Sequence, residues 1–423
     1  MSSEDKSRRS FIKNTILGST ALMAYPWLEA VAKEPAVSMA AANKIRIGII
    51  GVGSRGQGLL HNLLAIETTH NIEIAAICDN YEPNYQRAIE LTKGKAKAFY
   101  EYRKLLEMNN IDAIVIATPL HQHAHIVIDA LQAGKQVFCE KTMARTLEDT
   151  KRMADVHYST GKILQIGHQR LFDTRYLDAM DYIKSGKIGQ VTQIRAYWHR
   201  NNDWRRPVPE GKPELDRKIN WRLYKEYSCG LMTELASHQI QVANWAKDAQ
   251  PISVMGVGGI NYWKERREVY DNVALIYSYA DGTQFIYDSM TSNRFYGLEE
   301  QILGDKGTLE LETNKIYSEK PPKPAGILQL VNNIEKGIFE KIPIGGATWI
   351  PETALQYKGD YISADYSVNA TRIQLEAFVD SVRRGKPTPG LFEQGYHASV
   401  WTLLGQQAMD TQQIVNLPES MKI

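Results

Sequence analysis

Two short segments of the sequence carry side chains that can exchange a proton near neutral pH. Lys141 follows the apolar run Val137-Phe138-Cys139 and is preceded by Glu140. A desolvated lysine loses basicity, so it can hydrogen-bond a substrate hydroxyl and take part in its deprotonation. Glu234 and His238 lie four residues apart, which on a helix places them on one face. We interpret Lys141, Glu234 and His238 as candidate catalytic residues; the alternatives are an exposed Glu-Lys ion pair and a structural histidine.

A third segment has the pattern of a phosphate-binding turn. Residues 45–56 end a predicted strand with G-x-G-x-x-G and enter a predicted helix. Gly51 and Gly53 would let the backbone turn tightly beside a pyrophosphate, and Gly56 would let helix and strand pack closely. The start of that helix offers free amides and a positive dipole. The candidate dinucleotide-binding residues here are Gly51, Gly53, Ser54, Arg55 and Gly56.

An acidic residue ends the next predicted strand. Asp79 follows Gly56 by 23 residues, where a carboxylate can accept hydrogen bonds from the hydroxyls of an adenosine ribose. Because Asp79 would repel a 2′-phosphate, it favours NAD over NADP. Arg55 is the nearby cation that argues for the opposite preference.

Three alternating histidines follow another predicted strand, in Thr118-Pro119-Leu120-His121-Gln122-His123-Ala124-His125. No carboxylate or cysteine motif at ligand spacing accompanies them, so we expect no metal site. The carboxyl ends of strands in a doubly wound sheet are where ligands bind, and a capped turn with a surface histidine is the alternative for His125. The candidate cofactor-binding residues at this edge are Thr118, Pro119, His121, His123, Glu140 and Lys141.

Short apolar runs alternate with helical segments through the first part of the chain. This alternation is typical of a parallel sheet covered on both faces, so residues 43–165 are predicted to form one doubly wound α/β domain. The predicted strands are 45–50, 72–78, 113–117 and 136–139; the predicted helices are 59–66, 125–131 and 147–158.

The pattern changes beyond residue 166, where longer alternating segments are joined by short turns. We expect a second α/β domain over 166–423 with an open, mainly antiparallel sheet. Residues 320–348, rich in Pro, Gly and Lys, are predicted to form a surface loop. The predicted strands are 191–198, 252–260, 273–279, 284–289, 299–303 and 308–311; the predicted helices are 176–184, 372–384 and 394–413.

The first residues resemble an export signal. Ser7-Arg8-Arg9-Ser10-Phe11-Ile12-Lys13 precedes a weakly apolar run and the small-x-small site Ala30-Val31-Ala32. We therefore expect residues 1–32 to be a twin-arginine signal peptide, residues 33–42 a linker, and the protein to be periplasmic. The apolar run is too short to be a permanent membrane anchor.

Composition narrows the class of protein. The 423 residues are 43% hydrophobic and 23% charged, as in globular proteins of two or three domains. Fifty basic and 48 acidic residues give a net charge of +2 without a basic face, so nucleic acid is not an expected partner. Three cysteines cannot form a disulfide scaffold.

In their order along the chain, these motifs resemble the glucose-fructose oxidoreductase, inositol dehydrogenase and rhizopine catabolism (Gfo/Idh/MocA) family. The resemblance rests on the glycine turn, Thr118-Pro119, Glu140-Lys141, the segment 167–170, Glu234 with His238, and residues 304–309. It implies a Rossmann domain, hydride transfer between a sugar or cyclitol carbon and nicotinamide, a homo-oligomer, and catalytic roles for Lys141, Glu234 and His238. Thr142 departs from the family's usual proline, and Glu234 and Gln241 from its usual aspartates.

Export limits the possible mechanisms, because a dehydrogenase exported from the cytoplasm has no free NAD available to it. We therefore expect a tightly bound cofactor that is reoxidised in place. This leaves three reactions open: oxidation of a sugar or glycoside hydroxyl, at carbon 3 of a pyranoside; glycoside hydrolysis through transient oxidation; and epimerisation. The candidate substrate-binding residues are Arg170, Trp221 and Arg222; Trp198, His199, Trp204 and Arg205 suit saccharide stacking and ordinary packing equally.

Overall fold

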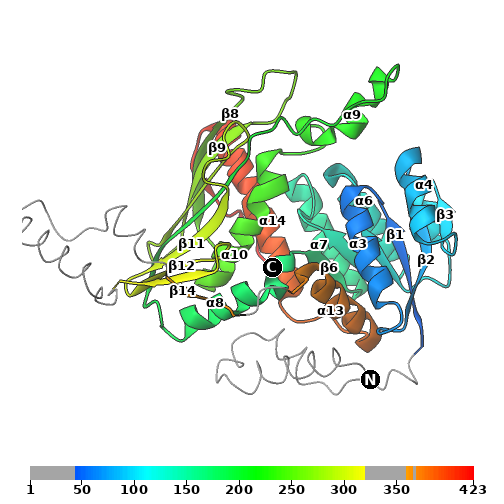
Figure 1. Ribbon diagram of the computed structural model, residues 1–423, viewed down its shortest axis with the longest axis horizontal. Coiled ribbons are helices and arrows are strands. Elements are labelled where there is room, and N and C mark those ends of the chain that lie inside the picture. The colour runs from blue at the N-terminus through cyan, green and yellow to red at the C-terminus, as the bar shows by residue number, and fades with distance from the viewer. Residues whose placement is uncertain (1–42, 320–358, 365–367) are drawn as a thin grey trace, which may run out of the picture.

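The computed structural model describes residues 43–319, 359–364 and 368–423 (Figure 1). The predicted signal peptide at 1–32, the linker at 33–42 and the loop predicted at 320–348 lie outside the described residues. Within the described ranges, no helix has both the length and the apolar character needed to cross a membrane.

The first domain is built on a sheet of six parallel strands, in the order β3-β2-β1-β4-β5-β6. Its central strands are almost wholly buried, as expected for apolar runs covered by helices on both faces. The predicted doubly wound sheet is confirmed. The strands are β1 (Ile45–Ile50), β2 (Ile72–Cys78), β3 (Lys97–Phe99), β4 (Ala113–Ile116), β5 (Gln136–Glu140) and β6 (Leu164–Gly167).

The helices of this domain begin where the strands end. In α7 the Thr146 side chain caps the first turn by accepting from the Asp149 amide at 3.1 Å, and Gly161 ends the helix in a left-handed conformation. The helices are α3 (Ser54–Ile66), α4 (Glu82–Leu91), α5 (Tyr102–Leu106), η2 (Leu120–Gln122), α6 (His123–Gln132) and α7 (Leu147–Thr160).

The second domain contains a nine-stranded sheet, in the order β14-β13-β12-β11-β7-β10-β9-β8-β15. All neighbouring pairs are antiparallel except β7 and β10, so the predicted open antiparallel sheet is confirmed with one parallel pair at its centre. The strands are β7 (Val191–His199), β8 (Ser253–Gly259), β9 (Asn272–Ser278), β10 (Gln284–Met290), β11 (Leu298–Gly304), β12 (Gly307–Glu310), β13 (Lys315–Ser318), β14 (Asp360–Tyr361) and β15 (Val415–Asn416).

Two long helices join the sheets. Helices α10 and α14 pack together, and α14 contacts both β8 of the second sheet and β6 of the first, so a continuous core connects the domains (Figure 1). The helical elements after β6 are η3 (Gln169–Phe172), α8 (Thr174–Lys184), η4 (Pro213–Leu215), α9 (Asp216–Ile219), η5 (Trp221–Leu223), the π-helical turn η6 (Met232–Ala236), α10 (Ser237–Lys247), α13 (Ala370–Arg384), α14 (Leu391–Thr411) and η7 (Glu419–Met421).

The structure departs from the sequence interpretation in how the chain is shared between the domains. Strand β6 extends two residues past the boundary predicted at residue 165. Helix α13 follows the second sheet in sequence but packs on α3, and its Phe378 ring lies 5.7 Å from that of Phe138 in β5. The first domain is therefore completed by residues near the end of the chain.

Candidate active site

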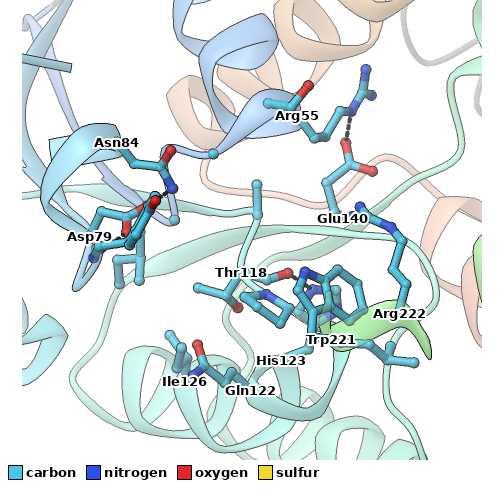
Figure 2. Close-up of a pocket in the computed structure, with 18 of the residues that line it drawn as sticks. Arg55, Asp79, Asn84, Thr118, Gln122, His123, Ile126, Glu140, Trp221 and Arg222 are labelled. Carbon is cyan, nitrogen blue, oxygen red and sulfur yellow. Dashed lines mark hydrogen bonds and ion pairs between the residues drawn. The ribbon is translucent and has the colours of Figure 1, made fainter. Parts of the chain in front are cut away.

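A cavity of about 780 Å³ lies along the carboxyl-end edge of the first sheet, between the two domains. One wall consists of residues at or just after the carboxyl ends of the six strands, and the facing wall comes from residues 198–222, from η6 and from the start of α10. Ligands of open α/β sheets bind at this edge. Figure 2 shows the side chains that converge on it.

The glycine turn has the close approaches that a dinucleotide site requires. Gly51 has φ +85°, and a Cβ there would lie 2.7 Å from the Thr118 amide nitrogen. A Cβ on Gly56 would lie 2.0 Å from the Gly51 carbonyl oxygen, whereas one on Gly53 would meet only Asn84, at 3.5 Å. Gly51 and Gly56 are thus needed for packing, and Gly53 leaves its backbone open to the cavity. Ser54 begins α3 and also lines the cavity.

Asp79 lies at one end of the cavity, beside the glycine turn. It accepts hydrogen bonds from the amides of Val52 (2.9 Å) and Tyr81 (2.8 Å) and from the Asn84 side chain (3.3 Å). Burial raises the pKa of Asp79, and these hydrogen bonds oppose that rise. A carboxylate held in this way can accept from ribose hydroxyls. The residues at this end therefore fit an adenine dinucleotide without a 2′-phosphate.

Arg55 lies away from Asp79. Its Nε donates to Glu140 Oε1 at 2.7 Å, and Figure 2 shows this pair separated from Asp79 and Asn84. Arg55 is thus not placed to offset the charge of a 2′-phosphate beside Asp79. The cation whose charge does act on Asp79 is Lys218, which donates to the Asn80 carbonyl at 2.7 Å.

Asp79→Asn should therefore weaken NADH binding about 10- to 100-fold, because a charged acceptor is lost. NADPH binding should improve, since Lys218 would then face a 2′-phosphate without an opposing carboxylate. Fluorescence titration of both dinucleotides measures this, with Asp149→Asn at the start of α7 as the control. An unchanged NADH to NADPH ratio would contradict the assignment.

The loop after β4 contributes Thr118, Pro119 and His123 to the cavity wall. The Thr118 hydroxyl is buried without a hydrogen-bond partner among the described residues. His123 ties two loops together: its Nδ1 lies 2.9 Å from the Thr142 carbonyl oxygen and its Nε2 lies 3.0 Å from that of Thr118. This histidine therefore shapes the site through the backbone.

His121 does not line the cavity, contrary to the prediction. Its ring packs 4.6 Å from that of Tyr227, while His125 lies 5.8 Å from Tyr102. His121 belongs to η2, whereas His123 and His125 belong to the first turn of α6, where residues two apart point to different faces of the helix. In the described ranges, no group of three or more His, Cys, Asp or Glu is placed to hold a metal ion.

Lys141 is fixed between the domains. Its ammonium donates to the carbonyls of Thr233 (3.1 Å) and Glu234 (2.7 Å), and Thr142 Oγ1 donates to the same Thr233 carbonyl at 3.0 Å. A proline at position 142 could not make this last bond. Burial lowers the pKa of Lys141, and the neighbouring carboxylates of Glu234 and Glu140 oppose that shift. The lysine retains one donor direction and lines the cavity.

Glu234 and His238 both line the cavity but are not paired with each other. Residues 232–236 form a π-helical turn, which is wider than an α-helical turn and alters the expected alignment of positions four apart. Glu234 Oε2 accepts from Arg222 Nε at 2.6 Å, and Oε1 accepts from Ser228 at 3.3 Å. The predicted carboxylate-oriented histidine is therefore corrected: Arg222, not His238, holds the carboxylate.

His238 is buried, and its Nδ1 has no hydrogen-bond partner within the part of the chain that the structure describes. Burial lowers its pKa well below the usual range, and the charges of Lys141 and Arg170 add to this shift. The imidazole is thus neutral at pH 7 and able to accept a proton.

The three predicted substrate-binding residues divide into two groups. Trp221 and Arg222 line the cavity, with the guanidinium 4.3 Å above the indole ring. Arg170 does not; its guanidinium is buried in ion pairs with Glu300 (2.5 Å) and Glu312 (2.8 Å). The prediction that Arg170 contacts the substrate is therefore wrong. Arg170 instead affects the site through its charge, which helps to lower the pKa of His238.

Sequence reasoning assigned no role at the site to several residues that lie there. His168 is buried with its ring 5.8 Å from that of His238, and Gln169, Arg200 and Arg206 line the cavity. His168 and Gln169 directly follow β6, so the strand-end rule would have found them had β6 been predicted. Arg200 follows β7 in the same way.

Two models of one protein family match this chain. The family model described as "Oxidoreductase family, NAD-binding Rossmann fold" (GFO/IDH/MocA) matches residues 45–168, and the GFO/IDH/MocA C-terminal domain model matches residues 176–310. Together they cover more than half of the chain.

The similar sequences include inositol 2-dehydrogenases. That of Pseudomonas fluorescens is 24% identical over 375 residues, covering 88% of this chain and 96% of the relative. That of Salmonella typhimurium is 27% identical over 280 residues, covering 64% and 74%.

Similar folds occur among solved structures. Levoglucosan dehydrogenase in complex with NADH and levoglucosan superposes with a TM-score of 0.67 at 19% identity, covering 89% of this chain and all of that one. A Bordetella pertussis dehydrogenase in complex with NADH and UDP-GlcNAcA gives 0.67 at 20% identity, covering 91% and 99%. At these identities the likeness establishes the fold.

Proposed function

The chain belongs to the GFO/IDH/MocA family of NAD-dependent oxidoreductases, and from this premise we propose that it oxidises a ring hydroxyl of a sugar or glycoside, at carbon 3 of a pyranoside, to a ketone. One observation carries the proposal: Lys141 and His238, which come from different domains, line the same cavity as the glycine turn and Asp79. Relatives named inositol and levoglucosan dehydrogenases favour a polyhydroxylated ring as substrate.

Lys141 and His238 together provide a path for the proton of the substrate hydroxyl. Lys141 donates its remaining hydrogen bond to the substrate hydroxyl and stabilises the alkoxide that develops there, while His238 accepts the hydroxyl proton. When bound, the dinucleotide supplies the nicotinamide that takes up the hydride. Glu234 balances the charge of Arg222 and fixes that side chain over Trp221.

A net hydrolysis of glycosides is the second candidate. The site offers two groups able to move protons, so one can serve the hydroxyl while the other serves the carbon-bound proton next to the new ketone. Elimination of the aglycone, addition of water and return of the hydride would complete a cycle without net redox. Epimerisation, with return of the hydride to the opposite face, is the third.

A panel of glycosides separates these reactions. The holoenzyme is incubated with each compound, with and without the electron acceptor dichlorophenolindophenol, and the products are identified by mass spectrometry. A keto-glycoside that accumulates only with the acceptor supports oxidation. Release of the aglycone without the acceptor supports hydrolysis and contradicts the first proposal.

We further propose that the protein is exported through the twin-arginine pathway to the periplasm with its NAD already bound. Support comes from Arg8-Arg9 in the sequence, a segment outside the described residues, and from the glycine turn and Asp79, which line the cavity between the domains. Protein recovered from the periplasm should release about one NAD per chain on denaturation, measured by mass spectrometry. Arg8→Lys/Arg9→Lys should keep the protein in the cytoplasm. Repeated absence of NAD from exported protein would contradict the proposal.

Homo-oligomerisation through the second sheet is also proposed. Met255 and Val257 of β8 are 49% and 66% exposed, so this strand presents apolar side chains to solvent. Light scattering of the purified chain tests the proposal, and a monomer at micromolar concentration would oppose it.

A further inference from the structure

Two arginines of the cavity wall have no carboxylate partner among the described residues. Arg200 follows β7, and Arg206 lies in the segment between β7 and α9. Neither makes an ion pair or a side-chain hydrogen bond with any described residue. Arg206 is exposed, whereas Arg200 Nε is buried without a partner. A buried donor without a partner is rare in native proteins, and this one belongs to a residue that lines the cavity.

The other cations of the cavity wall are already engaged. Each binds a carboxylate or a backbone carbonyl of the protein, and of these cations Arg55 alone also has a buried nitrogen, Nη2, without a partner among the described residues. The pairs are Arg55 with Glu140 (2.7 Å), Arg103 with Asp129 (3.0 Å), Arg222 with Glu234 (2.6 Å), Lys218 with the Asn80 carbonyl (2.7 Å) and Lys141 with the Thr233 and Glu234 carbonyls. Arg200 and Arg206 are therefore the exceptions.

Both arginines lie toward the catalytic end of the cavity. The Arg200 guanidinium is 5.0 Å from the centre of the Trp198 ring, and that ring is 6.1 Å from the His238 imidazole. Arg206 is close enough to Arg222 and Glu234 for their charges to act on it. The adenosine end is instead defined by Asp79 and its neighbours. The two arginines thus flank the space left for the substrate.

The charged residues that line the cavity also favour an anionic ligand. Seven Lys and Arg but only four Asp and Glu line the cavity. A bound dinucleotide offsets part of this excess through its pyrophosphate, which the turn at Gly51–Gly56 is placed to hold. A cleft of one sign raises the local concentration of ligands of opposite charge.

We propose that the substrate is an anionic saccharide, whose carboxylate, sulfate or phosphate group is bound by Arg200 and Arg206. The planar guanidinium matches all three oxyanions with paired hydrogen bonds. The inference rests on the proposed action on sugars and specifies the class of sugar.

Calorimetry on the NAD-loaded protein tests the inference without requiring turnover. The ligands are glucose and methyl glucoside as neutral probes, and glucuronate, glucose 6-sulfate and glucose 6-phosphate as anionic ones. We expect at least one anionic probe to bind at least about tenfold more tightly than the neutral probes, and the tightest of the three identifies the oxyanion. This preference should weaken as salt rises, because the attraction is screened.

Arg200→Gln and Arg206→Gln should each reduce that preference to less than about threefold and leave NADH affinity unchanged. Matched controls are Arg195→Gln, an exposed residue of β7, and Arg217→Gln, which pairs with Glu226 and Glu268 outside the cavity; both should keep the preference. Equal binding of neutral and anionic sugars overturns this inference alone. Absence of binding by every sugar overturns the proposed function as well. A tenfold loss of NADH affinity reassigns that arginine to the cofactor and overturns its role here.

Discussion

Lys141→Met should reduce kcat for oxidation about 10³-fold while NADH still binds, in keeping with the 10²- to 10⁴-fold contributions typical of groups that move or stabilise a proton in the transition state. Methionine is similar in length and apolar, so it fills the space of the lysine stem. It cannot donate to the carbonyls of Thr233 and Glu234, nor to a substrate hydroxyl. The loss should appear in kcat and kcat/KM together, because the interaction is strongest when the alkoxide has developed.

The control for this variant is Lys151→Met in α7, a partly exposed lysine whose one ion pair among the described residues is with Asp155. It should retain wild-type kcat. Lys141→Arg is the conservative change, since it keeps the positive charge and the hydrogen-bond donors in a planar group of different shape. Activity of Lys141→Met within threefold of wild type would exclude the lysine from the chemistry. A lost NADH site would instead show that the lysine holds the domains together.

The parts of the fold that sequence reasoning predicted are those governed by local pattern. The strand over 45–50, the glycine turn after it and Asp79 at the end of the next strand were all found, because apolar runs and glycines report directly on a parallel sheet. Strand β6 was not predicted, since its four residues include Gln165 and Gly167 and so lack an apolar signal. Because β6 was missed, His168, whose ring lies 5.8 Å from that of His238, was missed as well.

The parts that were wrong depend on contacts between distant residues. Arg170 was predicted to bind substrate, but Glu300 and Glu312 reach it from the second sheet, more than 120 residues later. The spacing of Glu234 and His238 predicted a pair on an α-helix, yet the helix is locally π-helical and Arg222 takes the carboxylate. A single sequence without homologues carries no signal for either arrangement.

The two domains meet at one cavity, and the proposed mechanism requires that Lys141 and His238 both line it. Lys141 follows β5 of the first sheet and His238 begins α10 of the second domain, almost a hundred residues apart. Had they faced unrelated surfaces, no proton could pass between them and a common substrate. The Lys141 ammonium instead bonds to the carbonyl of Glu234, one helical turn before His238.

His238→Ala is the second change expected to have a large effect: kcat should fall about 10²- to 10⁴-fold with NADH affinity retained, because the proton acceptor is removed while the cofactor end of the cavity is untouched. Added imidazole should restore part of the activity if the cavity left by the side chain admits it. A variant with full activity would remove His238 from the mechanism, and His157→Ala, a buried histidine of α7, controls for the loss of an imidazole elsewhere.

The pH dependence distinguishes proton transfer from a structural role of His238. Burial and the Lys141 charge hold the pKa of His238 well below its usual value, so the wild type should keep its activity from alkaline pH down through neutrality and lose it only under more acidic conditions. In Lys141→Met one of the charges that lowers this pKa is gone. The pKa of His238 should then rise, and since the base acts only when unprotonated, the acidic loss of residual activity should move to higher pH. An acid limb at the same pH in both proteins would show that the titrating group is not His238.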